Sequence, residues 1–441
     1  MNIVGFLIDI APLSLKRAAR LRTPKISLTA LAVIALALSC GSPTQGLAAT
    51  TRTIRSFSGA NGQWPSTGLI MDANNVLYGT TRIGGTNNKG TIFSLTPALT
   101  GSAWRYKRLY NFTVDGSEPF GDLVFGPDGA LYGTAWTGGS SACANGCGVV
   151  YRLAPPLPGQ MLWKWSILHA FSGGPGDGGT PIGPVVFGPD GALYGTTAFG
   201  GKDQHGTVFM LTPPNPPSTS WHSHIISKFR GNLDGEEPWG GLTLDPNGIL
   251  YGTTTRGGDA ICGCGTVFKL KPPAGTVTTW TRLNLRKFKG QPDGSSPYSK
   301  LMLHNGALYG TTFLGGTLDY GTVFKLTPQP DGSYKQTILN NFGGDGRNPL
   351  FTGPLAVDTN GALYGTTTGS SGVDFGGTVF RLSPPVTGTA WTRTTLHTFL
   401  NNGHDGYTPN AGVLLSKTGR IFGTTVLGGN AFLGAAFVVD P

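Results

Sequence analysis

The chain has 441 residues, of which only 12% are charged, and a net charge of +10 at neutral pH. Its basic residues occur mostly singly, and no basic run is interleaved with aromatic side chains, which argues against a nucleic-acid-binding protein. The 71 glycines and 32 prolines stand at fixed offsets between short apolar runs, which indicates turns in a β-rich protein rather than a low-complexity chain.

Residues 1–49 have the pattern of an export leader. Basic residues at positions 16–25 precede an apolar run, residues 26–38, which is short for a membrane span and typical of a signal-peptide core. Cleavage near Ala48 would release the mature chain. Alternatively, the segment that ends at Cys40 resembles a lipoprotein cleavage box, and a lipid on Cys40 would then be the single membrane contact that we expect. Both routes predict an exported protein, in the periplasm, at the cell surface or outside the cell.

The motif Leu-Tyr-Gly-Thr-Thr, at Leu193–Thr197, recurs along the rest of the chain at nearly constant spacing. Such regular recurrence is the signature of a repeat architecture. The aromatic positions of the copies are Tyr78, Tyr132, Tyr194, Tyr251, Tyr309, Tyr364 and Phe422.

One repeat illustrates the expected strands. Residues 183–187 form a short apolar strand, Asp190 and Gly191 form a hairpin turn, and Leu193–Thr197 is the second strand. Residues 207–211 and 221–229 predict the third and fourth strands. The second and third strands are apolar on both faces, which is expected where each sheet packs between two similar sheets. The glycine inside the motif is expected to let an aromatic side chain of the next sheet approach closely.

Seven units of four antiparallel strands predict an all-β fold, a seven-bladed β-propeller over residues 50–441. The last repeat stops after its third strand, whereas residues 51–57 match the fourth strand of the other units. We therefore expect the strand 51–57 to pair with the C-terminal blade. This pairing would close the ring and cover an exposed strand edge.

Three motifs recur in fixed order over residues 51–441: Asp-Gly-x-x-Pro, Leu-Tyr-Gly-Thr-Thr-x-x-Gly-Gly and Gly-Thr-Val-Phe-x-Leu. Together they resemble the GloVer tandem repeat of exported bacterial proteins, the choice-of-anchor family. The resemblance implies a propeller-like layout and no established activity. Ala135 and Trp136 in the second repeat and Ala435 and Ala436 in the seventh depart from the pattern.

Four cysteines lie in pairs just before the third strand of their repeats, Cys143 with Cys147 and Cys262 with Cys264. Because these two repeats are not neighbours in the sequence, we expect a disulfide within each loop, which agrees with export. A zinc site that uses all four cysteines is the alternative. Apart from that alternative, no metal ion and no cofactor are expected.

Two classes of loop are expected on one face of the ring, the Asp-Gly-x-x-Pro crossovers between blades and the Gly-Gly loops between second and third strands. Propellers commonly bind ligands where such loops converge, so this face is the candidate binding surface. The crossover acids that could contact a cation or a polar ligand are Asp115, Asp177, Asp234, Asp293, Asp345 and Asp405. The alternative is that these aspartates hydrogen-bond only the local backbone of their turns.

Residues that occur in one repeat only are more informative, because a requirement of the fold would recur. The candidates in these loops are Glu118, Trp136, His205, Glu236 and Trp239. Aromatic side chains among scattered acids and bases would suit a sugar-binding surface. Alternatively, the aromatic side chains fill the junctions between blades.

No complete set of catalytic residues is found, and the sequence lacks a nucleophile elbow, a phosphate loop and a dinucleotide fingerprint. The preferred hypothesis is a monomeric, exported binding or interaction module whose partner is a glycan or another surface protein. A carbohydrate-active enzyme, either a polysaccharide lyase or a glycoside hydrolase, is the alternative. It would be favoured if Glu118, Glu236, His205 and Trp136 converged near the axis. A purely structural surface protein is a third hypothesis.

Overall fold

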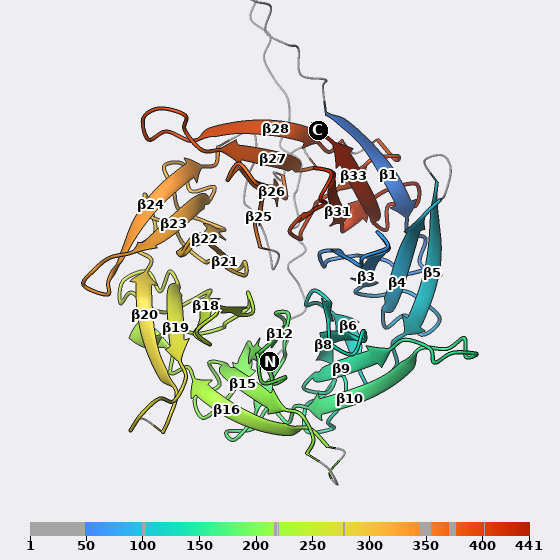
Figure 1. Cartoon of the computed structure of the whole chain (residues 1–441), viewed down its shortest axis with the longest axis horizontal. Helices are drawn as coiled ribbons and strands as arrows, with labels where there is room; N and C mark the ends of the chain where they lie inside the picture. Colours follow the sequence, from blue (N-terminus) through green and yellow to red (C-terminus); the bar gives the residue numbers. More distant parts are fainter. Residues whose placement is uncertain are drawn as a thin grey trace, which may run out of the picture. The chain divides into compact units, whose positions relative to one another are not determined.

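The computed structural model describes residues 49–441 except 99–102, 216–217, 219, 277, 344–353, 370–375 and 401. Antiparallel sheets in the unit Leu47–Pro441 are arranged around an axis as a seven-bladed β-propeller (Figure 1). Within the described ranges, helical structure is confined to the short 3-10 turn Asn232–Asp234. Those ranges contain no helix whose length and hydropathy would allow it to cross a membrane.

Blades 1 to 4 follow the predicted order of strands from the axis outward. Blade 1 contains β2 (Ile70–Met71), β3 (Leu77–Thr81), β4 (Thr91–Pro97) and β5 (Trp104–Asn111). Blade 2 contains β7 (Val124–Phe125), β8 (Leu131–Thr137), β9 (Val149–Ala154) and β10 (Lys164–Ala170), and β6 (Ser117–Pro119) also pairs with β8. Blade 3 contains β12 (Val186–Phe187), β13 (Leu193–Thr197), β15 (Thr207–Thr212) and β16 (His222–Lys228). Blade 4 contains β17 (Thr243–Leu244), β18 (Leu250–Thr254), β19 (Thr266–Lys271) and β20 (Thr281–Lys287).

Blades 5 to 7 repeat this order. Blade 5 contains β21 (Met302–His304), β22 (Ala307–Thr312), β23 (Thr322–Pro328) and β24 (Tyr334–Asn341). Blade 6 contains β25 (Ala356–Val357), β26 (Leu363–Thr367), β27 (Thr378–Ser383) and β28 (Thr392–Thr398). Blade 7 contains β30 (Leu414–Leu415), β31 (Ile421–Thr425), β33 (Ala435–Asp440) and β1 (Thr50–Ser56). Two short ribbons join loops of the same face, β11 (Gly178–Gly179) with β14 (Phe199–Gly200) and β29 (Gly406–Tyr407) with β32 (Leu427–Gly428).

The predicted ring closure is confirmed. The N-terminal strand β1 pairs antiparallel with β33, in a register that runs from Thr50 opposite Asp440 to Ser56 opposite Ala435. In Figure 1 the blue β1 lies directly beside the dark red β33. Without β1, the backbone groups of β33 that face outward would be an unpaired edge.

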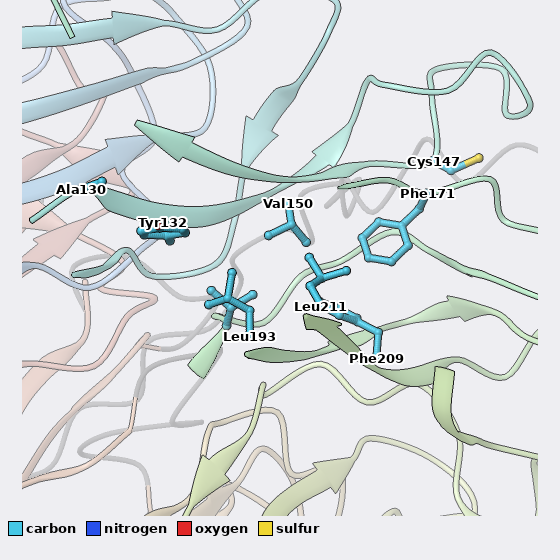
Figure 2. Close-up of a cluster of buried hydrophobic side chains, with 9 residues drawn as sticks. Ala130, Tyr132, Cys147, Val150, Phe171, Leu193, Phe209 and Leu211 are labelled. Atoms are coloured by element: carbon cyan, nitrogen blue, oxygen red, sulfur yellow. The ribbon is translucent and has the colours of Figure 1, made fainter. Parts of the chain in front are cut away.

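Each blade packs against the next through a pair of buried aromatic rings. Phe171, at the end of the outer strand of blade 2, lies against Phe209 of blade 3, with ring centroids 5.1 Å apart and both side chains fully buried (Figure 2). The same contact recurs around the ring with centroid distances of 5.0 to 5.4 Å. The other pairs are Phe57–Phe93, Phe112–Tyr151, Phe229–Phe268, Phe288–Phe324, Phe342–Phe380 and Phe399–Phe437.

The glycine of the repeated motif is required by an aromatic ring of its own blade. Gly79 lies directly opposite Phe93 in the β3–β4 ladder, and a Cβ atom at Gly79 would be 2.8 Å from that ring. The expectation that the ring comes from the next sheet is therefore wrong. The aromatic side chain of the neighbouring blade, Phe57, instead packs against Phe93. Cross-strand register explains the difference, because directly opposed residues are the nearest neighbours in a sheet.

The two departures from the repeat pattern are compensated within their own blades. In blade 3 the buried hydroxyls of Thr197 and Thr207 hydrogen-bond at 2.8 Å. In blade 2 both positions are apolar, since Ala135 pairs with Val149. In blade 7 Ala435 replaces one threonine, and the hydroxyl of Thr425 donates to the carbonyl of Leu427 at 2.9 Å. Neither departure leaves a buried hydroxyl without a partner, which would cost stability.

Removal of β1 is expected to open the ring. We compare a protein that begins at Ser58 with one that begins at Ala49, using light scattering after size-exclusion chromatography. The shorter protein should aggregate, because β33 loses its backbone partner and Phe93 loses the ring of Phe57. A monomeric Ser58 protein with an unchanged melting temperature would contradict this closure mechanism.

Truncation of one inter-blade ring should also be costly. We expect Phe171→Ala to lower stability by about 3–5 kcal/mol, since it leaves a cavity between two blades. Phe432, which is 52% exposed, provides the matched control, and Phe432→Ala should change stability little. Thermal and denaturant unfolding of both variants measure the difference. Equal losses of stability in the two variants would show that the aromatic pair does not stabilise the blade junction.

Candidate functional site

The crossovers and the Gly-Gly loops meet on one face, as expected, and the backbone joins them. Glu237 precedes Pro238 in the crossover from blade 3 to blade 4 and has a φ of 56°. Its N–H donates to the carbonyl of His205 in blade 3 at 3.0 Å, and its carbonyl accepts the N–H of Thr255 in blade 4 at 3.1 Å. One residue therefore connects the loops of two blades. The equivalent residues in the other described crossovers also have positive φ, and they are Trp64, Glu118, Thr180, Ser296 and Thr408.

The crossover prolines explain the glycine that precedes each third strand. A Cβ atom at Gly206 would lie 2.7 Å from the ring of Pro238, which belongs to the next blade. Gly265 has the same relation to Pro297, also at 2.7 Å. Proline and glycine in separate motifs are thus two sides of one contact, and the loops on this face are held at fixed positions around the axis.

Two crossover aspartates bind their own turns and a histidine of the preceding outer strand. Asp177 accepts the N–H groups of Ser172 at 2.9 Å and Gly178 at 2.8 Å, and its carboxylate lies 3.1 Å from Nε2 of His169. Asp405 repeats this arrangement, with Nε2 of His397 at 2.9 Å. Burial alone would raise the pKa of Asp177, but the hydrogen bond from His169 and those from the two N–H groups hold that pKa below its usual value.

The other crossover aspartates differ in their partners. Asp234 accepts the N–H of Arg230 at 3.0 Å and forms an ion pair with Arg282 of blade 4. Asp293 accepts the N–H of Lys289 at 3.0 Å and lies 2.6 Å from the guanidinium of Arg286. Asp115 lines a cavity described below, and Asp345 lies outside the described residues. Turn formation and side-chain pairing thus account for the placement of the described aspartates other than Asp115, and ligand binding by any of them stays a prediction.

Glu118 and Trp136 come together at the junction of blades 1 and 2. Arg82, in the Gly-Gly loop of blade 1, donates from Nε at 3.0 Å and from Nη2 at 2.9 Å to one carboxylate oxygen of Glu118. The same guanidinium lies over the ring of Trp136 at 4.9 Å and over that of Phe120 at 5.5 Å. This arrangement fixes a charged pair on an aromatic platform. We call Arg82, Glu118, Phe120 and Trp136 the Arg82 cluster.

His205 and Glu236 form a separate contact between blades 3 and 4. Nδ1 of His205 lies 2.7 Å from the Glu236 carboxylate. Trp239 follows in the same crossover, and its ring centroid is 5.5 Å from that of Tyr298 in the next crossover. The predicted residues are therefore brought together in two groups with different basic partners, Glu118 with Arg82 and Glu236 with His205. No contact joins the two carboxylates in the described part of the chain.

A cavity with a volume of 570 Å³ is found beside the Arg82 cluster. It is lined by Lys89, Asp115, Ser117 and Glu118 and by the loop of blade 2 at residues 137–146. The predicted disulfide Cys143–Cys147 is confirmed and closes this loop. Cys262 and Cys264 are likewise bonded to each other in blade 4, so the four sulfur atoms do not form a zinc site.

Within the described ranges, no three His, Cys, Asp or Glu side chains gather as a metal-ligand set. Asp122 and Lys300, which line a second cavity at the axis, are not among the residues predicted from the sequence. The signal was present, because other repeats have glycine or proline at the equivalent position.

These features define a seven-bladed β-propeller whose blades are copies of one sequence repeat. The sequence model of the Gloeobacter/Verrucomicrobia repeat family matches residues 44–161, 140–349 and 265–441. The chain belongs to this family. The resemblance noted from the motifs is thereby confirmed. The sequence matches none of the curated proteins with which it was compared.

Several solved structures are similar to this chain at low identity. A putative oxidoreductase (glucose dehydrogenase) from Thermus thermophilus is 19% identical over 73% of this chain and 94% of its own, with a TM-score of 0.43. PorZ, a surface component of the type-IX secretion system of Porphyromonas gingivalis, is 15% identical over 85% of this chain and 46% of its own, with a TM-score of 0.48. The NanB sialidase of Streptococcus pneumoniae is 12% identical over 86% and 69%, with a TM-score of 0.38. Similarities of this size say nothing about the activity of this chain.

The acid sensitivity of the Asp177 contact can be measured. At about pH 7 we expect Asp177→Asn to destabilise the protein by about 1–2 kcal/mol, since charge-assisted hydrogen bonds are lost. Because the fold lowers the pKa of Asp177, this contribution is complete above the unfolded-state pKa and disappears as the pH falls through the folded-state value.

The free energies of unfolding of the unaltered protein and of Asp177→Asn should therefore become equal in acid. Denaturant titrations at about pH 7 and at intervals down to about pH 1, below both the folded-state and the unfolded-state pKa, provide the measurement. Asp203, which is exposed, supplies the control variant Asp203→Asn. A destabilisation by Asp177→Asn that is independent of pH would mean that the carboxylate charge has no part in it.

Proposed function

We propose that this protein is an exported bacterial binding module and that its loop face binds a polysaccharide at the junction of blades 1 and 2. The Arg82 cluster carries the proposal. Sugars present apolar C–H faces and hydroxyl groups, so a site for them combines aromatic rings with fixed polar groups. Half-buried Trp136 supplies the ring, buried Phe120 supports it, and the charged groups of Arg82 and Glu118 are held in place beside them.

The neighbouring cavity adds further polar groups to this platform. Lys89, Asp115 and Ser117 line it together with Glu118, so donors and acceptors both face the space. The volume of 570 Å³ lies within the range of small-molecule sites and is large enough for about one or two sugar rings. The disulfide Cys143–Cys147 restrains the wall opposite, which limits the conformational entropy that binding would cost.

Half-buried tryptophans continue from the Arg82 cluster toward blade 4, which favours an extended ligand. Trp136 and Trp239 both pack against a buried cluster of Phe120, Ile182 and Ala198. Tyr298 continues the series beyond Trp239. Trp136, Trp239 and Tyr298 therefore place aromatic side chains at several blade junctions of the loop face, which suits a polymeric ligand.

The pairing of the acids supports binding rather than hydrolysis. A glycoside hydrolase of the common type opposes two carboxyl groups across one bond. Here Glu118 is bound to Arg82, whereas Glu236 is bound to His205 in another blade junction. The two disulfides support export, because such bonds persist in oxidising compartments.

A polysaccharide and glycan array with the purified protein tests the proposal. We expect binding to at least one glycan, and we expect Trp136→Ala and Trp239→Ala each to weaken it about thirtyfold, which corresponds to about 2 kcal/mol for a central aromatic side chain. Trp221→Ala is the matched control, because Trp221 precedes β16 at the opposite face and packs against the core of blades 2 and 3. Absence of binding to every glycan, or an equal loss in the control, would overturn the proposal.

A further inference from the structure

The inner edge of the ring carries two charged side chains at a position that is uncharged in the other blades. This position lies just before the innermost strand of each blade, and the seven residues are Gly68, Asp122, Pro184, Gly241, Lys300, Pro354 and Gly412. The fold accepts glycine or proline here. A charged residue in blade 2 and another in blade 5 are therefore not explained by the repeat itself.

Both charged side chains line the same cavity at the axis. This axial cavity has a volume of 240 Å³, and its walls come from blades 1, 2, 3, 5, 6 and 7. Its apolar lining includes Leu69, Leu123 and Val413. Asp122 and Lys300 are the ionisable groups among the described residues of that lining, so no other described residue of the wall neutralises either charge.

The carboxylate of Asp122 is oriented by the backbone of blade 1. Its Oδ1 accepts the N–H of Gly68 at 2.6 Å, and a Cβ atom at Gly68 would lie 3.2 Å from Oδ2. Glycine at that position therefore gives the carboxylate its space. One oxygen is held by the backbone, and the other has no hydrogen-bond donor among the described residues.

The ammonium group of Lys300 has neither a hydrogen-bond acceptor nor an ion-pair partner in the described part of the chain, and it does not reach Asp122. The two charges nevertheless influence each other across the cavity. Burial raises the pKa of Asp122 and lowers that of Lys300, and the opposite charge of the partner acts against both shifts. Two half-buried opposite charges that form no ion pair with each other leave room for a ligand that contacts both.

We propose that the axial cavity binds a small zwitterion, whose ammonium group contacts Asp122 and whose carboxylate contacts Lys300. Opposite charges that are separated by a gap match a ligand with both charges, whereas a metal ion would require more than one carboxylate. The cavity volume of 240 Å³ is small and suits a ligand of roughly the size of an amino acid. The apolar walls favour a ligand with a hydrocarbon body between or beside its charged ends. This site is independent of the proposed polysaccharide surface.

Calorimetric titration of the purified full-length protein with a graded series of amino acids tests the proposal. The probes are glycine, β-alanine, 4-aminobutyrate, 5-aminopentanoate, 6-aminohexanoate and L-leucine, which differ in the separation of their charges and in apolar body. We expect at least one probe to bind with a stoichiometry of one. Its N-acetyl derivative, which lacks the ammonium charge, and its amide, which lacks the carboxylate, should each bind at least about tenfold more weakly, corresponding to about 1.4 kcal/mol.

Variants then assign the two ends of the ligand. Asp122→Asn retains an acceptor for the N–H of Gly68, and it should abolish the difference between the probe and its N-acetyl derivative. Lys300→Gln should abolish the difference between the probe and its amide. Such pairwise loss of discrimination identifies direct contact, which a general structural effect would not produce. Asp203→Asn and Lys417→Gln, at exposed positions, are the controls and should leave affinity unchanged.

Three outcomes would overturn the proposal: no probe binds, the singly charged derivatives bind as well as the parent, or the variants weaken all probes equally. The comparison of parent and derivatives uses the unaltered protein, so it remains decisive if a variant fails to fold. If the protein binds a glycan but no amino acid, only the axial site is rejected. If it binds an amino acid but no glycan, only the polysaccharide surface is rejected.

Discussion

The buried pair of aromatic rings between successive blades is the contact on which the rest of the structure depends. Phe171 at the end of one outer strand meets Phe209 in the third strand of the next blade, and Phe209 in turn covers the glycine of its own second strand. A side chain at that glycine would displace the ring and separate the blades. The contact is repeated at all seven blade junctions. The junction closed by β1, where the two ends of the propeller meet, is therefore packed like the others.

The loop face follows from this packing and is joined by backbone atoms. In each described crossover the residue before proline has positive φ and hydrogen-bonds the loops of two blades through its own N–H and carbonyl, as Glu237 does. These backbone hydrogen bonds do not depend on which side chain the residue carries. The position can therefore hold a tryptophan, a glutamate, a threonine or a serine without disturbing the ring. Because the backbone joins the loops, the side chains at single junctions can differ, as in the Arg82 cluster, while the fold stays the same.

The same reasoning applies at the axis. Glycine or proline is sufficient for the fold at the position before each innermost strand. Asp122 and Lys300 are therefore not required by the fold, and their partial burial costs stability. The crossover aspartates have a different character. Asp177 and Asp405 are tied to their turns and to histidines of the outer strand. A residue that recurs from repeat to repeat thus stabilises the fold, whereas a residue that occurs in one repeat only is a candidate for function.

The sequence alone determined the period, the strands, the closure by residues 51–57 and the pairing of the cysteines. These features depend on neighbours along the chain or on a pattern repeated seven times, so each copy supports the others. The tertiary structure decided which blade supplies the ring over Gly79, that Arg82 binds Glu118 on top of Trp136, and that Asp122 and Lys300 share one cavity. Those contacts join side chains of different blades or opposed strands, whose distances follow from register and from the closure of the ring rather than from any local pattern.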